Sequence, residues 1–283
     1  MNLIRTYALP AVIILAFILV AFWMSLMIWG SWYDEWSGYN ATWAISDGYC
    51  NIAVIPIRGE IYSYASEDER YAFPVTVGDD ILGLIDHIES EPGIDGVMLQ
   101  IDSPGGEMTP ATEIVDRLKA LDLPVAAYIR EMGASAAYYI ATGADTIIAT
   151  PLSDVGSIGV TMSYLDQSRQ NEDAGLEFIS LSSGKYKDYG NPNRPLTEEE
   201  RALLERDLKI YHDVFVANIA GNRGLPVEEI AALADGSSMP ASLALEKKLI
   251  DSVGNRDTVR EWFASTLIMD TENVVLCRPA QVY

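Results

Sequence analysis

The sequence predicts an α/β fold with a largely parallel β-sheet, preceded by one N-terminal transmembrane helix. Short apolar runs typical of buried strands alternate along the chain with amphipathic segments typical of helices, which is the pattern of βαβ crossovers. An almost wholly apolar stretch, residues 8–30, is long enough to cross a bilayer, which takes about 20 helical residues. We therefore expect an anchor over residues 1–30, a linker over 31–50 and one globular domain over 51–283.

The apolar stretch is expected to stay attached as an uncleaved anchor. A cleaved signal peptide has a shorter apolar core of about 7–15 residues, and here tryptophan and tyrosine residues follow the run, as at a membrane interface. Arg5 precedes the stretch, whereas Asp34 and Glu35 follow it. The positive-inside rule therefore places the N-terminus in the cytoplasm and the domain outside. Asn40 begins a glycosylation sequon that is usable only on the outer side.

Composition limits the classes of function. Apolar residues make up 49% of the 283 residues, as in a globular protein with a good core, and the net charge of −22 opposes binding to nucleic acid or to anionic lipid by the folded domain. The two cysteines, Cys50 and Cys277, form no C-x-x-C motif, which argues against structural zinc. They can pair outside the cytosol, although two separate buried thiols are the favoured interpretation. No metal, nucleotide or other cofactor is expected.

The first half of the domain is predicted to alternate strands with helices. Helical spacing of apolar residues predicts a helix over 78–90 and another that contains Ile114, Val115 and Leu118. Mixed polarity over 62–77 predicts a mobile loop. The expected strands are 51–57, 96–101, 125–129 and 146–149.

The second half is predicted to be mainly helical. A glycine-punctuated turn over 154–160 and a strand over 176–181 are expected first. Thr197 and Glu200 have the spacing of a capping box, so a long amphipathic helix should begin at Thr197 and run to about Gly221. Shorter helices should follow at 227–234, 240–247 and 258–267.

Ser135 is the candidate nucleophile. It lies in the stretch E-M-G-A-S-A-A-Y-Y-I-A, between a predicted strand and a run that can continue as a buried helix. Unpaired N–H groups at a helix start favour developing negative charge, so this turn suits an attacking hydroxyl. The alternative, favoured when the stretch is considered alone, is that Ser135 only caps the helix.

Gly105 and Gly106 are candidates for binding such a charge. They follow the predicted strand 96–101 and open a helix, and glycine permits close approach of the backbone to a ligand. Their N–H groups can form half of an oxyanion hole. A dinucleotide site is the rival, but the G-x-G-x-x-G spacing is absent from this turn. A plain strand-to-helix turn is the simplest alternative.

A general base for Ser135 must also be found. The two histidines, His87 and His212, lie within predicted amphipathic helices, where surface positions are expected. Lysine can replace histidine when its amine is neutral, as in Ser–Lys dyads. Lys185 and Lys187 lie in the loop after the predicted strand 176–181, and each could equally be a solvated loop lysine.

Four motifs, in this order and at these gaps, carry a family resemblance: S-P-G-G (103–106), G-A-S-A-A-Y-Y-I-A (133–141), V-G-S-I-G-V (155–160) and S-G-K-Y-K-D (183–188). Together they resemble the signal peptide peptidase A family, which consists of membrane-anchored Ser/Lys-dyad proteases of the Clp protease/crotonase superfamily. The resemblance runs from Asn51 to the last helix and implies a crotonase/Clp protease-like core of βαβ units.

The resemblance also implies residue roles. Ser135 would be the nucleophile and Lys187, not Lys185, the base. Gly105 or Gly106, together with Ala136, would supply the oxyanion hole, and Ser157 would hydrogen-bond the lysine amine. The chain departs from the family where Ala136 and Ala137 replace the usual Gly-Gly, which leaves the amide in place but puts substrate preference in doubt.

The resemblance therefore predicts a membrane-bound serine endopeptidase whose domain, residues 51–283, lies outside the cytoplasm and cleaves hydrophobic peptides such as remnant signal peptides. It implies contact with the lipid bilayer through residues 8–30 and a homo-oligomeric ring in which the dyad can form across a subunit boundary. Two alternatives stay open. One is an acyl-thioester enzyme of the crotonase type, which uses the oxyanion hole without a nucleophilic serine. The other is a non-catalytic membrane scaffold.

Overall fold

The computed structural model describes residues 20, 22–24, 49–66, 68, 70 and 73–277. An eight-stranded sheet forms its centre, in the order β2-β1-β3-β4-β5-β8, with β6 paired to β4 and β7 to β6. Every pairing is parallel except β6 with β7, so the predicted parallel α/β architecture is confirmed. The strands are β1 (Ile52–Tyr62), β2 (Val75–Val77), β3 (Gly96–Gly106), β4 (Val125–Ala134), β5 (Thr146–Ala149), β6 (Asp154–Gly156), β7 (Ser238–Pro240) and β8 (Ser252–Val253).

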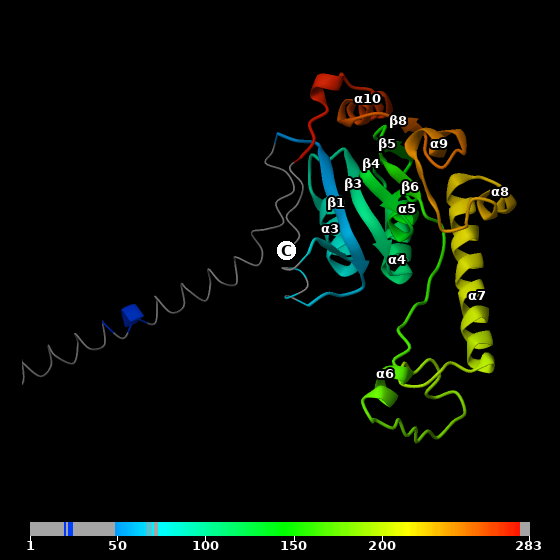
Figure 1. The fold of residues 1–283 in the computed structure, drawn as a ribbon. Helices are drawn as coiled ribbons and strands as arrows, with labels where there is room; N and C mark the ends of the chain where they lie inside the picture. Colours follow the sequence, from blue (N-terminus) through cyan, green and yellow to red (C-terminus); the bar gives the residue numbers. More distant parts are fainter. Residues whose placement is uncertain are drawn as a thin grey trace, which may run out of the picture.

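Helices cover both faces of this sheet (Figure 1). Residues of α3, α4, α5 and α7 form the larger apolar core with one face, and residues of α10 form a smaller core with the other. The helices are α3 (Gly78–Ser90), α4 (Met108–Lys119), α5 (Ala136–Ala141), α6 (Ser168–Asp173), α7 (Glu198–Arg223), α8 (Val227–Ala231), α9 (Ala241–Glu246) and α10 (Arg256–Leu267), with a 3₁₀ turn η1 (Thr271–Asn273).

Alternation along the central strands explains the two cores. In β3, Leu99 belongs to the larger core, whereas its neighbour Met98 belongs to the α10 core, and both are fully buried. A parallel strand covered on both faces needs apolar residues at successive positions. This requirement explains why these strands appear in the sequence as continuous apolar runs.

Several predicted elements are confirmed and three are wrong. The turn expected over 154–160 begins instead with β6, which pairs with β4 and β7. The helix over 78–90 and the strand over 146–149 have the predicted bounds, and Thr197 and Glu200 form the predicted capping box of α7. The expected loop over 62–77 instead ends in β2, which pairs with β1. Residues 176–181 form no strand, since no strand in the described part of the chain lies beside them and most of their apolar side chains are exposed.

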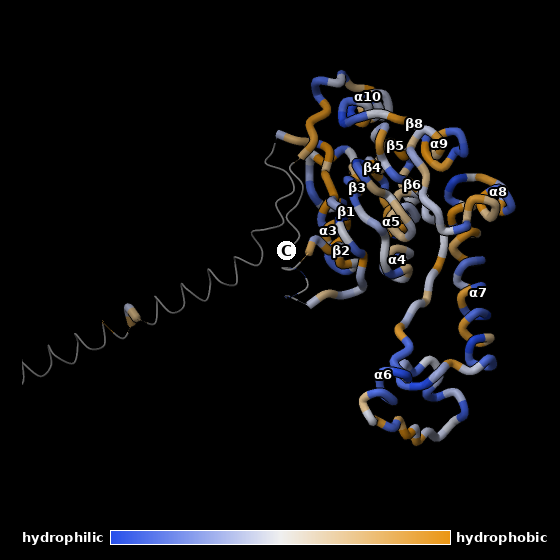
Figure 2. Tube along the Cα trace, in the orientation of Figure 1, coloured by the Kyte–Doolittle hydropathy of each residue, from blue (hydrophilic) through white to orange (hydrophobic). Residues whose placement is uncertain are grey.

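Residues 161–197, which we call the arm, project from the body of the molecule. Figure 1 shows the arm with α6 at the bottom of the view, away from the sheet, where the lower end of α7 meets it. Apolar positions lie along it (Figure 2), among them Leu165, Ile179 and Leu181, which are 78%, 70% and 95% exposed. The arm thus carries unburied apolar surface outside the core.

Cys50 and Cys277 form a disulfide, with their Cα atoms 5.0 Å apart, so the interpretation as separate thiols is wrong. The C-terminal segment returns beside the start of β1, where the Cys277 N–H donates to the Ile52 carbonyl over 2.8 Å. This return brings together two residues separated by 227 positions, which no local pattern could reveal.

The predicted anchor, the linker and the Asn40 sequon lie almost entirely outside the described residues. Nowhere in the part that the structure describes is there a helix both long and apolar enough to cross a membrane.

Candidate active site

Ser135 occupies a tight turn between β4 and α5. Its φ of 53° and ψ of −124° are unusual for a residue with a side chain, and such conformations cost roughly 1–3 kcal/mol. The turn is tied to β6 because the Ser135 N–H donates to the Gly156 carbonyl over 2.7 Å. The hydroxyl does not cap α5, and it has no hydrogen-bond partner among the described residues. The helix-cap alternative is therefore wrong, and the hydroxyl is free to react.

Gly105 lies against this turn. A Cβ at position 105 would lie 2.8 Å from the Ser135 Cβ and 2.9 Å from the Ala136 nitrogen, and φ is +101°. Only glycine fits such a position. Its N–H donates to the Ser103 hydroxyl over 3.1 Å, and that buried hydroxyl donates in turn to the Gly59 carbonyl over 2.6 Å. The end of β3 is thereby held beside Ser135.

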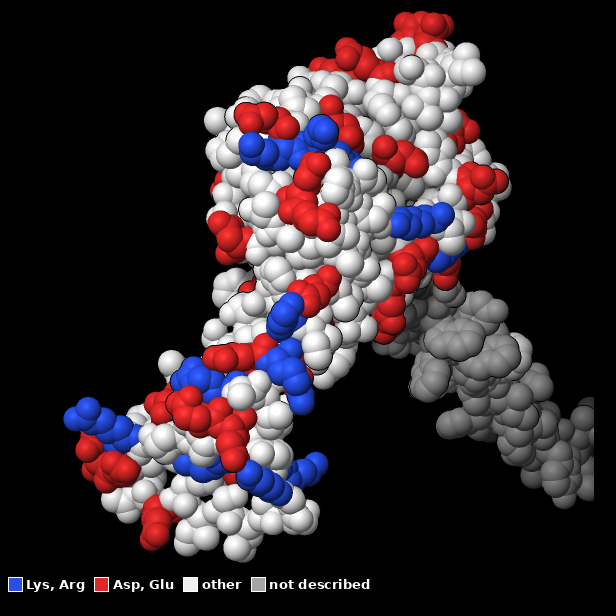
Figure 3. Space-filling model, turned by 90° about the vertical axis from the view of Figure 1, so that its right-hand side faces the viewer, with Lys and Arg blue, Asp and Glu red and all other residues white. Residues whose placement is uncertain are grey.

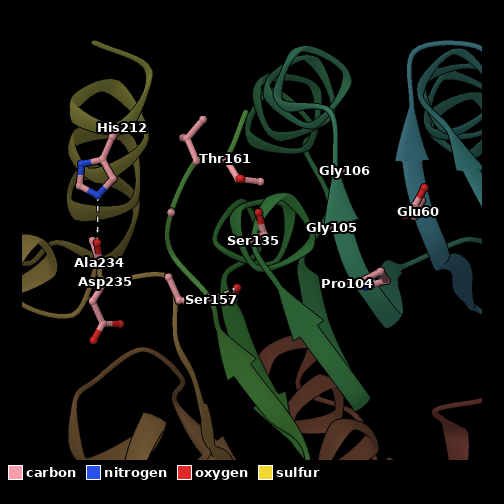
Figure 4. Close-up of a pocket in the computed structure, with 13 residues that line it drawn as sticks. Glu60, Pro104, Gly105, Gly106, Ser135, Ser157, Thr161, His212, Ala234 and Asp235 are labelled. Carbon is pink, nitrogen blue, oxygen red and sulfur yellow. Dashed lines mark hydrogen bonds between the residues drawn. The ribbon is translucent and has the colours of Figure 1, made fainter. Parts of the chain in front are cut away.

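A cleft of about 590 Å³ opens over Ser135. Figure 4 shows the serine between the end of β3, with Gly105 and Gly106, and the segment after β6, with Ser157. Ala136, the next residue in the chain, is fully buried. No Lys or Arg lines the cleft within the described residues. The structure therefore brings together five of the six predicted site residues: Ser135, Gly105, Gly106, Ala136 and Ser157.

Ser157 resembles Ser135 in its backbone, with φ of 50°. Its N–H donates to the Ser237 carbonyl over 2.9 Å, and its hydroxyl donates to the Gly236 carbonyl over 3.0 Å. Because the hydroxyl proton is engaged, the oxygen lone pairs remain able to accept a hydrogen bond from an amine.

His212 also lines the cleft, which the expected surface position did not anticipate. Its Nε2 lies 2.9 Å from the Ala234 carbonyl oxygen, so Nε2 carries the proton. It forms no hydrogen bond with Ser135 among the described contacts. The sequence did contain a signal for this position. Phe215 and Ile219 follow His212 by three and seven positions, so all three lie on one face of α7, and the structure buries that face at Phe215 and Ile219. His87 lies on α3 beside Glu91, at 3.8 Å, as expected for a surface histidine.

Lys187 lies elsewhere in the same chain. It borders a separate hollow of about 480 Å³ in the arm, together with Phe178, Ile179 and Leu181. Figure 1 shows that the arm extends away from α5, which follows Ser135. One chain therefore does not bring Lys187 to Ser135 or Ser157.

Lys185 is held by an ion pair with Glu199, with Nζ 2.5 Å from the carboxylate oxygen. This bond, together with an interaction with Tyr186, raises the pKa of Lys185 to about 12. Lys187 makes no ion pair within the described residues. The two lysines of the loop are thus in different states: one is paired, and the other is free.

The family models and the relatives that match this chain are described as proteases or peptidases. A family model described as Peptidase family S49 matches residues 117–268, and one described as Clp protease matches 74–155. A Methanocaldococcus jannaschii protein, provisionally named a protease, is 31% identical over 70% of this chain and 61% of its own length. A similarly named Synechocystis protein is 34% identical over 64% of this chain and 66% of its own.

One more relative and one solved structure also match part of this chain. An Enterococcus faecium protein, provisionally named signal peptide peptidase SppA, is 33% identical over 59% of this chain and 49% of its own length. The chain thus spans between about half and two thirds of the length of these relatives. A solved structure of a ClpP1 mutant from Listeria monocytogenes covers 72% of this chain and 92% of its own, with a TM-score of 0.48 and 17% identity.

Proposed function

This chain belongs to peptidase family S49, and from that premise we propose that it is a serine endopeptidase with Ser135 as nucleophile and Lys187 of a second copy as general base. The main support is the Ser135 turn, where a hydroxyl with no partner among the described residues lies in a strained conformation beside Gly105. Strain and a free nucleophile in one cleft are typical of acyl-transfer sites. Family membership also favours a hydrolase over the acyl-thioester alternative.

The proposed reaction follows from the residues in the cleft. The Ser135 hydroxyl attacks the peptide carbonyl carbon while a neutral Lys187 amine takes its proton. Since the Gly105 N–H is engaged by Ser103, the amides of Gly106 and Ala136 are the proposed donors to the oxyanion. The lysine ammonium then protonates the leaving amine, and water hydrolyses the acyl-enzyme with the same lysine as base.

The state of the two lysines supports Lys187 as the base. A general base must be neutral when it accepts a proton. The ion pair with Glu199 raises the pKa of Lys185 to about 12, which opposes this role. Lys187 is free of such a partner among the described residues.

The separation of Lys187 from the cleft supports a site shared between copies. The cleft has no Lys or Arg of its own in the described part, whereas the arm presents Lys187 and exposed apolar side chains away from the body. We propose that the arm of one subunit places Lys187 near Ser135 and Ser157 of the next, where Ser157 accepts a hydrogen bond from the amine.

We further propose that residues 51–283 are one domain outside the cytoplasm, behind the anchor 1–30 and the linker 31–50. The Cys50–Cys277 disulfide supports this location, because such bonds persist mainly in oxidising compartments. A domain anchored by residues 8–30 would meet hydrophobic peptides at the bilayer surface, such as remnant signal peptides.

Mixing two inactive variants tests the proposal. Ser135→Ala and Lys187→Ala chains, each alone, should fail to cleave a fluorogenic apolar peptide. Co-refolded in equal amounts, they should regain about a quarter of wild-type activity, because one in four subunit boundaries then combines an intact serine with an intact lysine. An inactive mixture, beside a wild type that survives the same refolding, would place the dyad within one chain. Full activity of both single variants would exclude the Ser–Lys mechanism and direct attention to His212, which also lines the cleft.

A further inference from the structure

Two adjacent glutamates at the start of α7 contact the loop that bears Lys187, but in different environments. Glu199 binds Lys185 at the surface, where both side chains are more than 60% exposed. Glu200 binds Arg194, and its side chain is only 5% exposed. One pair is therefore solvated and adaptable, and the other is largely enclosed.

The Arg194–Glu200 pair is joined at two points. Arg194 Nη2 lies 2.6 Å from Glu200 Oε1, and Nη1 lies 2.9 Å from Oε2. Such bidentate contacts fix the orientation of the guanidinium relative to the carboxylate as well as the distance between them. The carboxylate also accepts the Thr197 N–H over 3.1 Å, so the pair is attached to the capped first turn of α7.

The same guanidinium reaches the residue that follows Lys187. Arg194 Nη2 donates to the Asp188 carbonyl over 2.8 Å. The Asp188 carboxylate accepts from the Ser180 hydroxyl and from the Asn191 amide, each over 2.9 Å. On the other side, the Lys187 N–H donates to the Gly184 carbonyl over 3.1 Å. The backbone at Lys187 is thus fixed on both sides, while its amine is free of described partners.

We infer that the Arg194–Glu200 pair is a positioning element for Lys187, which sets the point from which the amine reaches the cleft of the neighbouring subunit. The inference rests on the proposed function of Lys187. Its physical basis is that the arm holds Lys187 outside a compact core, so its position depends on these few contacts. A displacement of about 1 Å at a catalytic group can cost on the order of 10²-fold in rate.

Two variants separate positioning from folding. Glu200→Gln removes the charge but keeps the capping box, because glutamine serves at this helix position. Arg194→Lys keeps the charge but loses the bidentate contact with Glu200 and the hydrogen bond to the Asp188 carbonyl. In the full-length oligomer, each should lower kcat by about 10- to 100-fold with KM within about threefold. The matched control is Glu199→Gln, which breaks the exposed neighbouring pair and should change kcat less than about twofold.

Coupling to Lys187 gives the decisive measurement. The rate at which a fluorophosphonate probe labels Ser135 should fall in Glu200→Gln, yet Glu200→Gln should cause no further loss in a Lys187→Ala background. Additive losses, or a loss of oligomer mass and melting temperature with unchanged kcat per assembled site, would show a purely structural role. Unchanged kcat in both variants, beside an inactive Lys187→Ala, would overturn the inference alone. An active Lys187→Ala would overturn the proposed function and the inference with it.

Discussion

Ser135 combines three properties that suit a reactive nucleophile. Its backbone is strained, its hydroxyl has no partner among the described residues, and a glycine packs against its turn. Motif and turn chemistry pointed to the residue, but only the structure distinguishes it from a helix cap, because capping depends on where the hydroxyl points. The position of His212 in the cleft could not be predicted from sequence alone either, because helical spacing indicates a face of α7 but not how α7 packs against the body.

Substituting Gly105 tests how closely this turn is fitted. In Gly105→Ala the added methyl would lie within 3 Å of the Ser135 Cβ and of the Ala136 nitrogen. The serine must then shift, and activity should fall by on the order of 10²-fold or more, measured as kcat and as probe labelling of Ser135. Gly93→Ala is the control, because φ is also positive there, at +89°, but nothing lies within 4 Å of the new methyl. Equal losses in both variants would show that backbone strain alone is responsible.

The choice between Lys185 and Lys187 could not be made from spacing. Residues two apart in an extended segment face the same side, and only the ion pair of Lys185 with Glu199 separates them. That contact joins a loop to the first turn of a helix, and its geometry depends on the whole arm. The family resemblance, rather than residue chemistry, pointed to Lys187.

Alanine substitution of each lysine should therefore give opposite results. Lys187→Ala should abolish cleavage of an apolar peptide, whereas Lys185→Ala should stay within about tenfold of wild type, a barrier change near 1.4 kcal/mol. Steady-state rates of peptide cleavage measure both variants. If Lys185→Ala were inactive and Lys187→Ala active, the assignment of the base would be reversed.

Elements whose partners are close in sequence could be predicted well. The helix α3 and the capping box of α7 depend on local spacing and agree with the structure. The predicted strand 176–181 fails for the opposite reason. Its apolar residues suit a strand, but β-structure depends on a neighbouring strand, and none lies beside it in the described chain. The disulfide was missed because its halves meet only through the fold.

The first turn of α7 makes a pH-dependent contribution to stability. Hydrogen bonds from Arg194, then from the Thr197 N–H, lower the pKa of Glu200 to about 2. Since the folded pKa lies below the unfolded value of about 4.3, the stabilisation is complete above that value and disappears as pH falls towards 2. Glu200→Gln should therefore be less stable than wild type at pH 7, by about 1.5–3 kcal/mol, and nearly equal near pH 2.

Urea unfolding at the two pH values measures this difference directly. Glu199→Gln is the control, because its partner Lys185 is exposed and the pair should contribute little. A gap between wild type and Glu200→Gln that stays constant from pH 7 to pH 2 would show that the carboxylate is not responsible.

Charge is distributed unevenly over the whole molecule. The chain has a net charge of −22, and acidic side chains predominate over the body in Figure 3, whereas both signs mix on the projecting arm. Acidic bodies repel one another, so a nearly neutral arm is the part best suited to approach a second copy. Residues 161–197 hold five acidic residues (Asp166, Glu172, Asp173, Glu177 and Asp188) and four basic ones (Arg169, Lys185, Lys187 and Arg194).

Exposed apolar side chains on the arm lead to the last prediction. Leu181 is 95% exposed and lies beside the Lys187 hollow, and clustered apolar surface on a soluble domain usually marks a protein interface. Leu181→Glu adds a charge without touching the core, so the chain should fold but fail to assemble. Its oligomer mass and its peptidase activity should fall together, because each cleft then lacks the lysine of a neighbour.

Leu152→Glu is the matched control for Leu181→Glu. Leu152 is 94% exposed but lies on the body, after β5, so this variant should stay assembled. Mass photometry of full-length protein in detergent measures both. A Leu181→Glu chain that remained oligomeric and active would show that the arm does not form the subunit contact.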